Sequence, residues 1–115
     1  MQNTLSKGDI ILVSNDPKPN KTNEQKGRRP WLVVSEGLLN EVSPFVWVVP
    51  FTSTERDYPL ALNWSKVCST SETTGTLLCD QLTTMDIRHR DYKLIERVEV
   101  PEEVDYRIQA ILGYK

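Results

Sequence analysis

The fold is decided by a run of β-branched and aromatic residues, Phe45-Val46-Trp47-Val48-Val49, which predicts a buried strand ended by Pro50. Two similar apolar runs precede it, IILV at residues 10–13 and WLVV at residues 31–34, and each predicts a further strand. Between these two runs, residues 17–27 are polar and contain two prolines, which predicts a long loop. The first half of the chain therefore indicates a β-rich fold.

Shorter strands are expected after this region. Residues 60–62 and 75–79 predict short strands on either side of a polar loop at residues 69–74. Residues 92–100 mix apolar and charged positions, which is typical of an exposed strand. Several short strands in so small a chain favour a strongly bent sheet or a barrel.

One clear helix signal lies at the C-terminal end, over residues 101–113. Pro101 suits the first helical position, and the two glutamates after it favour the positive end of the helix dipole. One apolar face follows at helical spacing, formed by Val104, Ile108, Ile111 and Leu112. Gly113 is a typical stop signal. The predicted fold is mainly β with α, a small barrel with a C-terminal helix.

The length of 115 residues suits one domain, and no repeat or low-complexity tract divides it, so residues 1–115 are expected to form a single domain. No apolar run approaches the roughly 20 residues that span a bilayer. The N-terminal residues also lack the apolar core of a signal peptide. We therefore expect a cytoplasmic protein with no membrane partner, in which Cys68 and Cys79 are free thiols.

The formal net charge of −2 argues against a general nucleic-acid coat protein. The charges are nevertheless segregated along the chain. Residues 18–29 carry five cations and one acid, whereas residues 96–105 carry five acids and one cation. Such runs are commonly solvated loops, but a chain with this pattern can also present one basic face to a polyanion.

Several kinds of chemistry are disfavoured by the residues present. His89 is the only histidine, and no His, Cys or carboxylate cluster has metal-ligand spacing, so we expect neither a metal nor another cofactor. No glycine-rich loop precedes Lys-Ser or Lys-Thr, which excludes a P-loop. A Ser-His-Asp triad would need His89 as its base between Arg88 and Arg90, a setting that disfavours the neutral imidazole.

Two segments suit phosphate chemistry. Arg29 stands where the long loop meets a strand, and Thr52-Ser53-Thr54 place a row of hydroxyls after another strand. An arginine offers planar, bidentate donors to phosphate and stays protonated. RNA supplies its own nucleophile, the 2′-hydroxyl, so a protein that cleaves it must align that group, help to remove its proton and neutralise the phosphorane. An arginine, a hydroxyl and one carboxylate such as Glu24 suffice, which favours RNA over DNA.

Each of these features also has a simpler interpretation. Arg28 and Arg29 can be a solvated surface pair, and the hydroxyls of residues 52–54 can satisfy a turn. Glu24 can pair with a neighbouring lysine. The pair at residues 80–81, Asp-Gln, can cap the turn that follows its strand.

A set of short motifs resembles the PemK/MazF toxin family, also called mRNA interferases, in order and over nearly the whole chain. The motifs are Gly8-Asp9-Ile10, Asp16-Pro17, Glu24-Gln25-x-Gly27-x-Arg29-Pro30, Val48-Val49-Pro50-x-Thr52-Ser53, Cys79-Asp80-Gln81 and Arg88-His89-Arg90. The resemblance implies a homodimeric SH3-like β-barrel with a C-terminal helix, cleavage of single-stranded RNA, and inhibition by a cognate antitoxin. It also implies that Arg29 and Thr52 occupy catalytic positions and Glu24 that of an active-site carboxylate.

The resulting hypothesis is a metal-independent endoribonuclease toxin of a type II toxin–antitoxin pair, leaving a 2′,3′-cyclic phosphate and a 5′-hydroxyl. Arg29 would stabilise the pentacoordinate phosphate, Thr52 would position or polarise it, and Glu24 would orient the nucleophile or help to deprotonate it. The candidates for binding RNA are Lys26, Arg28, Ser53, Asp80, Gln81 and Arg90.

Two other functions stay open at this point. A toxin related to CcdB, which binds a DNA topoisomerase, would keep the barrel but would not need the Arg29–Thr52 pair. An inactive nucleic-acid-binding barrel is the second alternative.

A homodimer is expected whichever function holds. The small chain has much aromatic surface, supplied by Trp31, Trp47 and Trp64. We expect part of this surface in a homodimer interface rather than all of it in the core.

Overall fold

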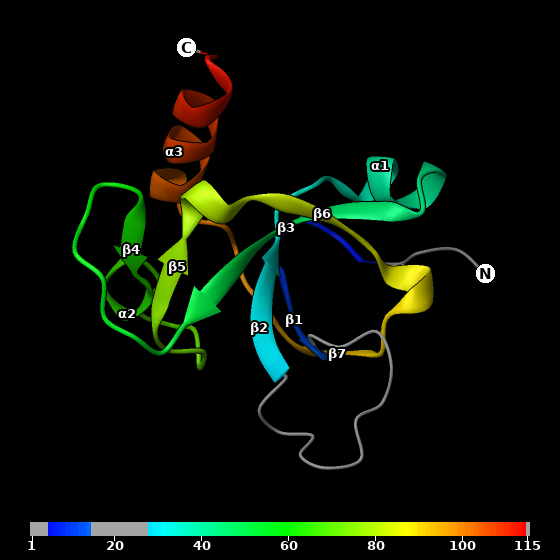
Figure 1. Ribbon diagram of the computed structural model, residues 1–115, viewed down its shortest axis with the longest axis horizontal. Coiled ribbons are helices and arrows are strands. Elements are labelled where there is room, and N and C mark those ends of the chain that lie inside the picture. Colours follow the sequence, from blue (N-terminus) through cyan, green and yellow to red (C-terminus); the bar gives the residue numbers. More distant parts are fainter. Residues whose placement is uncertain (1–4, 15–27, 115) are drawn as a thin grey trace.

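The computed structural model describes residues 5–14 and 28–114. These residues form an antiparallel sheet in the order β4-β5-β3-β2-β1-β7, with β6 paired to β3 outside this path (Figure 1). The strands are β1 (Asp9–Ser14), β2 (Arg28–Val33), β3 (Phe45–Thr52), β4 (Ala61–Asn63), β5 (Thr76–Leu78), β6 (Thr83–Asp86) and β7 (Tyr92–Arg97). The helices are α1 (Gly37–Val42), α2 (Trp64–Val67) and α3 (Glu102–Leu112), and two 3₁₀ turns are η2 (Cys79–Gln81) and η3 (Ile87–His89).

β3 is the central strand because it pairs with three others. Val48 lies opposite both Val33 of β2 and Thr83 of β6, so these two strands lie along opposite edges of β3. Its last residues, Phe51 and Thr52, pair with β5. In the sheet order, β5 and β2 lie on opposite sides of β3. β5 and β6 therefore share the edge of β3 that faces away from β2, and η2 connects them.

The strand β3 continues past Pro50, so the prediction that this proline ends the strand is wrong. Pro50 lies opposite Trp31 of β2, and the strand runs on to Thr52. A proline lacks the N–H that a ladder needs, but here it stands where β3 leaves β2 and begins to pair with β5. Figure 1 shows the end of β3 diverging from β2.

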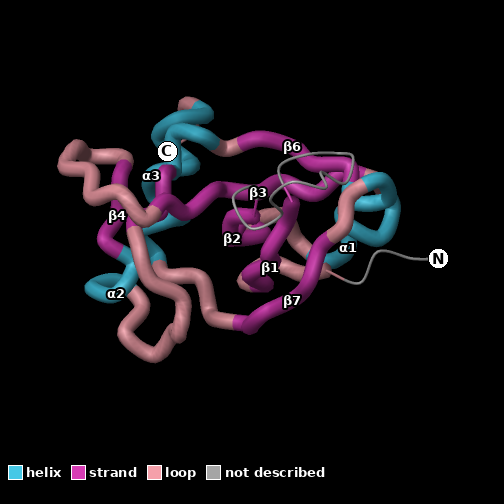
Figure 2. Tube along the Cα trace, turned by 60° about the horizontal axis from the view of Figure 1, so that its bottom comes forward, coloured by secondary structure: helices cyan, strands magenta, loops and turns pink. Residues whose placement is uncertain are grey.

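Both faces of the central strands are buried, which explains their continuous apolar runs. Successive residues of β1 point to opposite faces: Ile10 belongs to a core cluster that includes Trp64 and Val104 of α3, whereas Ile11 belongs to a second cluster with Met85. Figure 2 shows α2, α3 and β4 near one end of the sheet and α1 near the other. The predicted fold, mainly β with a C-terminal helix, is confirmed. The sheet path ends at β4 and β7, so the barrel is an open one.

The C-terminal helix α3 begins one residue later than predicted, because Pro101 is its N-cap and Glu102 its first residue. Val104 is fully buried, but the last apolar residues, Ile111 and Leu112, are 40% and 54% exposed. The predicted apolar face therefore packs on the sheet only through its first turns. Gly113 ends the helix as predicted, with a left-handed φ of 84°.

Helix α1 was not predicted from the sequence, and a buried polar network holds it. The Asn40 side chain is fully buried and donates hydrogen bonds to the carbonyls of Leu5 (2.8 Å) and Ser35 (3.1 Å). The Ser35 hydroxyl donates to Asn40 Oδ1 at 2.6 Å and accepts from the Trp47 N–H at 3.1 Å. This network fastens α1 to β3 through contacts distant in sequence.

The Gly8-Asp9 motif has a structural role. Gly8 has a φ of +101°, and a Cβ at this position would lie 2.1 Å from the Val98 carbonyl oxygen. Its N–H donates to the Val33 carbonyl and its own carbonyl accepts from the Val98 N–H, both at 2.9 Å. Asp9, only 2% exposed, accepts a hydrogen bond from Arg97 Nε at 3.1 Å. The motif thus joins the ends of β1, β2 and β7.

We expect Gly8→Ala to destabilise the fold more strongly than Gly113→Ala. Both substitutions place a side chain at positive φ, which costs about 1–3 kcal/mol, but a Cβ at Gly113 meets nothing within 4 Å. The Gly8 variant adds a clash with backbone, for a total of roughly 3 kcal/mol or more. Equilibrium denaturant unfolding measures the difference, and equal losses for the two variants would contradict this account.

Candidate functional site

Three arginines lie around the end of β1. Arg28 lies opposite Ser14 and Arg29 opposite Val13 in the β1–β2 ladder. Arg90, which follows η3, donates from Nη1 to the Ser14 carbonyl oxygen at 3.1 Å. Within residues 5–14 and 28–114, neither Arg28 nor Arg29 forms a salt bridge. The structure therefore brings Arg90, which is distant in sequence, to the end of β1 where the consecutive residues Arg28 and Arg29 lie.

Arg88 and His89, the other two residues of the Arg88-His89-Arg90 motif, do not join this group. Arg88 binds the Asp86 carboxylate through Nε at 3.1 Å and Nη2 at 2.9 Å. Asp86 also accepts from the Arg88 backbone N–H, and these hydrogen bonds hold the pKa of Asp86 below its usual value. His89 Nε2 lies 3.9 Å from the same carboxylate. Of the three basic residues, Arg90 is the one that reaches the arginine group.

Thr52 lies on the same face of the sheet as Arg29. Side chains alternate along a strand, so Arg29, Trp31 and Val33 of β2 share one face. Because Val33 belongs to the second core cluster, this is the face of β2 that packs on that cluster. On β3, Thr52 shares its face with Val48, which belongs to that same cluster. Trp31 pairs with Pro50, and Arg29 and Thr52 each lie two residues further toward the same end.

The hydroxyls at the end of β3 partly follow the simpler interpretation, in which they satisfy a turn. Thr52 Oγ1 accepts a hydrogen bond from the Thr54 N–H at 3.2 Å, as a turn residue would. Among the described residues, the Thr52 hydroxyl proton has no acceptor, so it is available to a ligand. Ser53 is exposed beside it. No hydrogen bond links Thr52 to Arg29 within this part of the chain.

Asp80 and Gln81 stand apart from the arginines. They belong to η2, which lies along the edge of β3 opposite to β2. Both side chains are exposed, and the Asp80 carboxylate accepts a hydrogen bond from the Tyr58 hydroxyl at 3.0 Å. Cys79, by contrast, is fully buried as a free thiol, and burial raises the pKa of Cys79 to about 11. The cysteine is therefore a core residue rather than a nucleophile.

Two predicted site residues, Glu24 and Lys26, lie outside the described residues. Within the described ranges, no three His, Cys, Asp or Glu side chains gather as ligands for a metal ion. No helix in the same ranges is long and apolar enough to cross a membrane.

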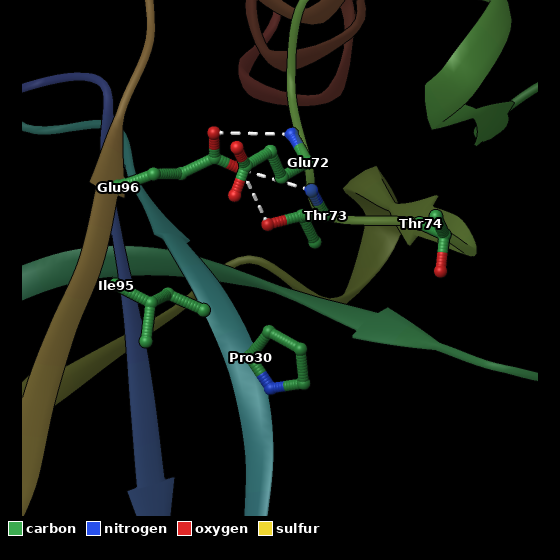
Figure 3. Close-up of a pocket in the computed structure, with 6 residues that line it drawn as sticks. All are labelled: Pro30, Glu72, Thr73, Thr74, Ile95 and Glu96. Atoms are coloured by element: carbon green, nitrogen blue, oxygen red, sulfur yellow. Dashed lines mark hydrogen bonds between the residues drawn. The ribbon is translucent and has the colours of Figure 1, made fainter.

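A cavity of about 320 Å³ lies between β2, β7 and the loop before β5 (Figure 3), lined by Pro30, Glu72, Thr73, Thr74, Ile95 and Glu96. The Glu96 carboxylate accepts hydrogen bonds from the hydroxyls of Ser71 (2.5 Å) and Thr73 (2.6 Å) and from the backbone N–H groups of Glu72 and Thr73. Burial alone would raise the pKa of Glu96, but these hydrogen bonds outweigh it and hold the pKa below its usual value.

Sequence reasoning missed Glu96. The sequence places Glu96 in an expected exposed strand at the start of an acidic run, and its hydrogen-bond donors lie 23 to 25 residues away. No local pattern marks such a pairing.

The fold is that of solved MazF structures. The crystal structure of MazE–MazF from Deinococcus radiodurans matches with a TM-score of 0.75 and 23% identity, over 97% of this chain and 98% of that one. An endoribonuclease in complex with its cognate antitoxin, from a mycobacterial species, matches with a TM-score of 0.70 and 22% identity, over 95% of each chain. These likenesses define a MazF-like fold.

Sequence comparison then gives the family. Residues 6–112 match the family described as PemK-like, MazF-like toxin of type II toxin–antitoxin system. Endoribonuclease PemK of Escherichia coli is 37% identical over 113 residues, covering 94% of this chain and 82% of its own. Endoribonuclease toxin MazF of Escherichia coli (strain K12) is 35% identical over 109 residues, 92% of each chain. The chain belongs to this PemK-like, MazF-like family of toxins.

Proposed function

We propose that this toxin cleaves single-stranded RNA without a metal, through attack by the 2′-hydroxyl, and leaves a 2′,3′-cyclic phosphate and a 5′-hydroxyl. That it is an endoribonuclease of a type II toxin–antitoxin system follows more directly, from its family and from curated relatives that are endoribonucleases. The observation that carries the finer proposal is the placement of Arg29 and Thr52 on one face of the sheet, at the end where Arg28 and Arg90 also lie.

In this mechanism the substrate provides the nucleophile and the protein provides charge and alignment. The Arg29 guanidinium offers two parallel donors to the non-bridging oxygens as negative charge develops on the phosphorane. The Thr52 hydroxyl, whose proton has no acceptor among the described residues, donates a hydrogen bond to the same phosphate and positions it for in-line attack. Glu24 is assigned to orienting the 2′-hydroxyl or accepting its proton.

The remaining arginines are assigned to binding the RNA backbone. Arg28 and Arg90 also lie at the end of β1, with Arg28 on the opposite face of β2 from Arg29, so an RNA strand that passes around this end of the sheet can contact them at successive phosphates. Ser53 extends the hydroxyl row, and Lys26 is assigned to the same surface. Asp80 and Gln81, on the other edge of β3, would contact a more distant nucleotide.

The nuclease is favoured over the two alternative functions. A topoisomerase-binding toxin or an inactive barrel has no use for Arg29 on the same face as the Thr52 hydroxyl, whose proton has no acceptor among the described residues. The curated relatives with 35–37% identity are endoribonucleases. We place the activity in the cytoplasm, where RNA is found and where Cys68 and Cys79 stay reduced.

We propose that the cognate antitoxin inhibits the enzyme by covering the arginine group. A surface that holds phosphates also attracts an acidic peptide, which can fold onto it. The solved relatives include toxins in complex with antitoxins, namely MazE–MazF and a mycobacterial pair.

We further propose a homodimer that buries an apolar patch formed by α1 and the start of β3. Its exposed members are Leu38 (77% exposed), Leu39 (58%), Val42 (80%), Phe45 (46%) and Trp47 (46%). So many large apolar side chains in one place are typical of an interface. Of the three tryptophans expected to share core and interface, Trp64 is fully buried in the monomer and Trp47 is half-exposed on this patch.

We expect cleavage to continue in excess EDTA, because arginine and hydroxyl groups supply the stabilisation of the phosphorane. Cut ends of a long mixed-sequence RNA should carry a cyclic phosphate, and an all-deoxy substrate should stay intact, because it lacks the nucleophile. A strict requirement for added Mg²⁺, or cleavage of the deoxy substrate, would disprove the mechanism.

Arg29→Ala is expected to lower the cleavage rate by about 10²–10³-fold, the usual effect of losing a preorganised donor to a developing oxyanion. Arg29→Lys should recover part of the rate, since it keeps the charge without the two-pronged contact. Thr52→Ser should be milder than Thr52→Ala. Arg88→Ala is the matched control, because Asp86 already binds that guanidinium, and it should stay near the wild-type rate. A folded Arg29→Ala protein with wild-type activity would overturn the assigned site.

The double variant Leu38→Glu/Val42→Glu is expected to be monomeric, because two charges four residues apart would occupy one face of α1 at the interface. Leu112→Glu, at an exposed apolar position of α3 outside the patch, should leave the dimer intact. Light scattering at micromolar concentration measures both. A monomeric wild type, or a dimeric double variant, would contradict this placement.

A further inference from the structure

The Glu96 carboxylate ties together two parts of the fold that are distant in sequence. It accepts four hydrogen bonds from three consecutive residues, Ser71, Glu72 and Thr73, of the loop between α2 and β5. Figure 3 shows Glu96 reaching from β7 to this loop across the top of the cavity. The loop is thereby fixed to the β7 side of the sheet.

A β-bulge in β7 places Glu96 for this task. Ile10 of β1 pairs with Glu96 and Ile11 pairs with Leu94, so Ile95 is an extra residue in the ladder. A bulge of this kind redirects side chains out of simple alternation. As a result, Ile95 and Glu96, although consecutive, both line the cavity next to Pro30.

The other end of the same loop fixes Thr52. Gly75 approaches the Thr52 carbonyl so closely that a Cβ at Gly75 would lie 2.6 Å from its oxygen. The next residue, Thr76, pairs with Thr52, and the β3–β5 ladder consists only of this pair and Phe51–Leu77. The position of Thr52 therefore depends on a ladder of two residue pairs, and Glu96 holds the loop that leads into the β5 strand of this ladder.

The direct connection between the two proposed catalytic strands stops short of the site. The β2–β3 ladder ends at Trp31 and Pro50, and Arg29 and Thr52 lie two residues beyond it on strands that diverge. The loop held by Glu96 supplies a second connection, from the β2–β1–β7 part of the sheet to the end of β3. We infer that Glu96 is a positioning residue, which sets the separation between Arg29 and Thr52 through residues 71–76; this inference rests on the proposed function of that pair.

Glu96→Gln tests the inference, because an amide cannot accept all four hydrogen bonds. We expect kcat for RNA cleavage to fall by up to about a hundredfold, which a misplacement of about 1 Å can cause, with little change in KM. Hydrogen exchange at residues 71–76 should become faster. Glu99→Gln is the matched control: it removes the same charge from an exposed residue just beyond β7 and should change neither quantity.

Thr73→Val provides a second, gentler test that holds even if Glu96→Gln fails to fold. It removes one hydroxyl donor and should lower kcat in the same direction by a smaller factor. In the double variant the two effects should combine to less than their product, because both act through one connection.

An unchanged kcat in a Glu96→Gln protein with a released loop would overturn the inference, as would a raised KM with an unchanged kcat, which would indicate contact with RNA instead. Arg29→Ala measured in parallel separates the two proposals. If Arg29→Ala is inactive and Glu96→Gln is fully active, the positioning role alone is wrong. If Arg29→Ala is active, the proposed site fails and the inference fails with it.

Discussion

The hydrogen-bond ladder of β3 is the constraint on which the rest of the structure depends. A strand has two edges, so β3 accommodates three partners only because it is eight residues long and lets β5 and β6 share one edge. Its start carries the apolar patch beside α1, its middle contributes to both core clusters, and its end carries Thr52. One strand thus links the proposed interface, the core and the proposed site.

Much of the fold could be predicted from the sequence, because the information was local. Continuous apolar runs revealed β1, β2 and β3, and the proline, acidic residues and glycine around α3 gave that helix to within a residue. The remainder depended on distant contacts. β6 has the sequence TTMD and forms because β3 offers an edge to pair with, and α1 is fastened by Asn40 to residues from other parts of the chain. Neither has a periodic pattern of its own.

In the candidate site, too, local features could be predicted and features that depend on distant contacts could not. The grouping of Arg28 and Arg29 was evident from the sequence, and strand alternation explains why Arg29 and Thr52 share a face once the register is known. The sequence did not reveal that Asp86 neutralises Arg88 while Arg90 joins the arginine group, since that choice is made by the turn η3. Glu96 was hidden for a related reason: its role depends on a bulge and on a loop from elsewhere in the chain.

Positive and negative side chains also lie on different parts of the molecule. The arginine group lies where β2 begins, whereas Glu102 and Glu103 are exposed at the start of α3, an element on the other side of the sheet's end from the start of β2 in Figure 1. A polyanion that approaches is attracted by one pole and repelled by the other, so it experiences a torque before any contact forms. At physiological ionic strength this torque acts only over the last ~8 Å of approach. Its consequence is a larger fraction of collisions in the productive orientation, and therefore a faster association rather than a tighter complex.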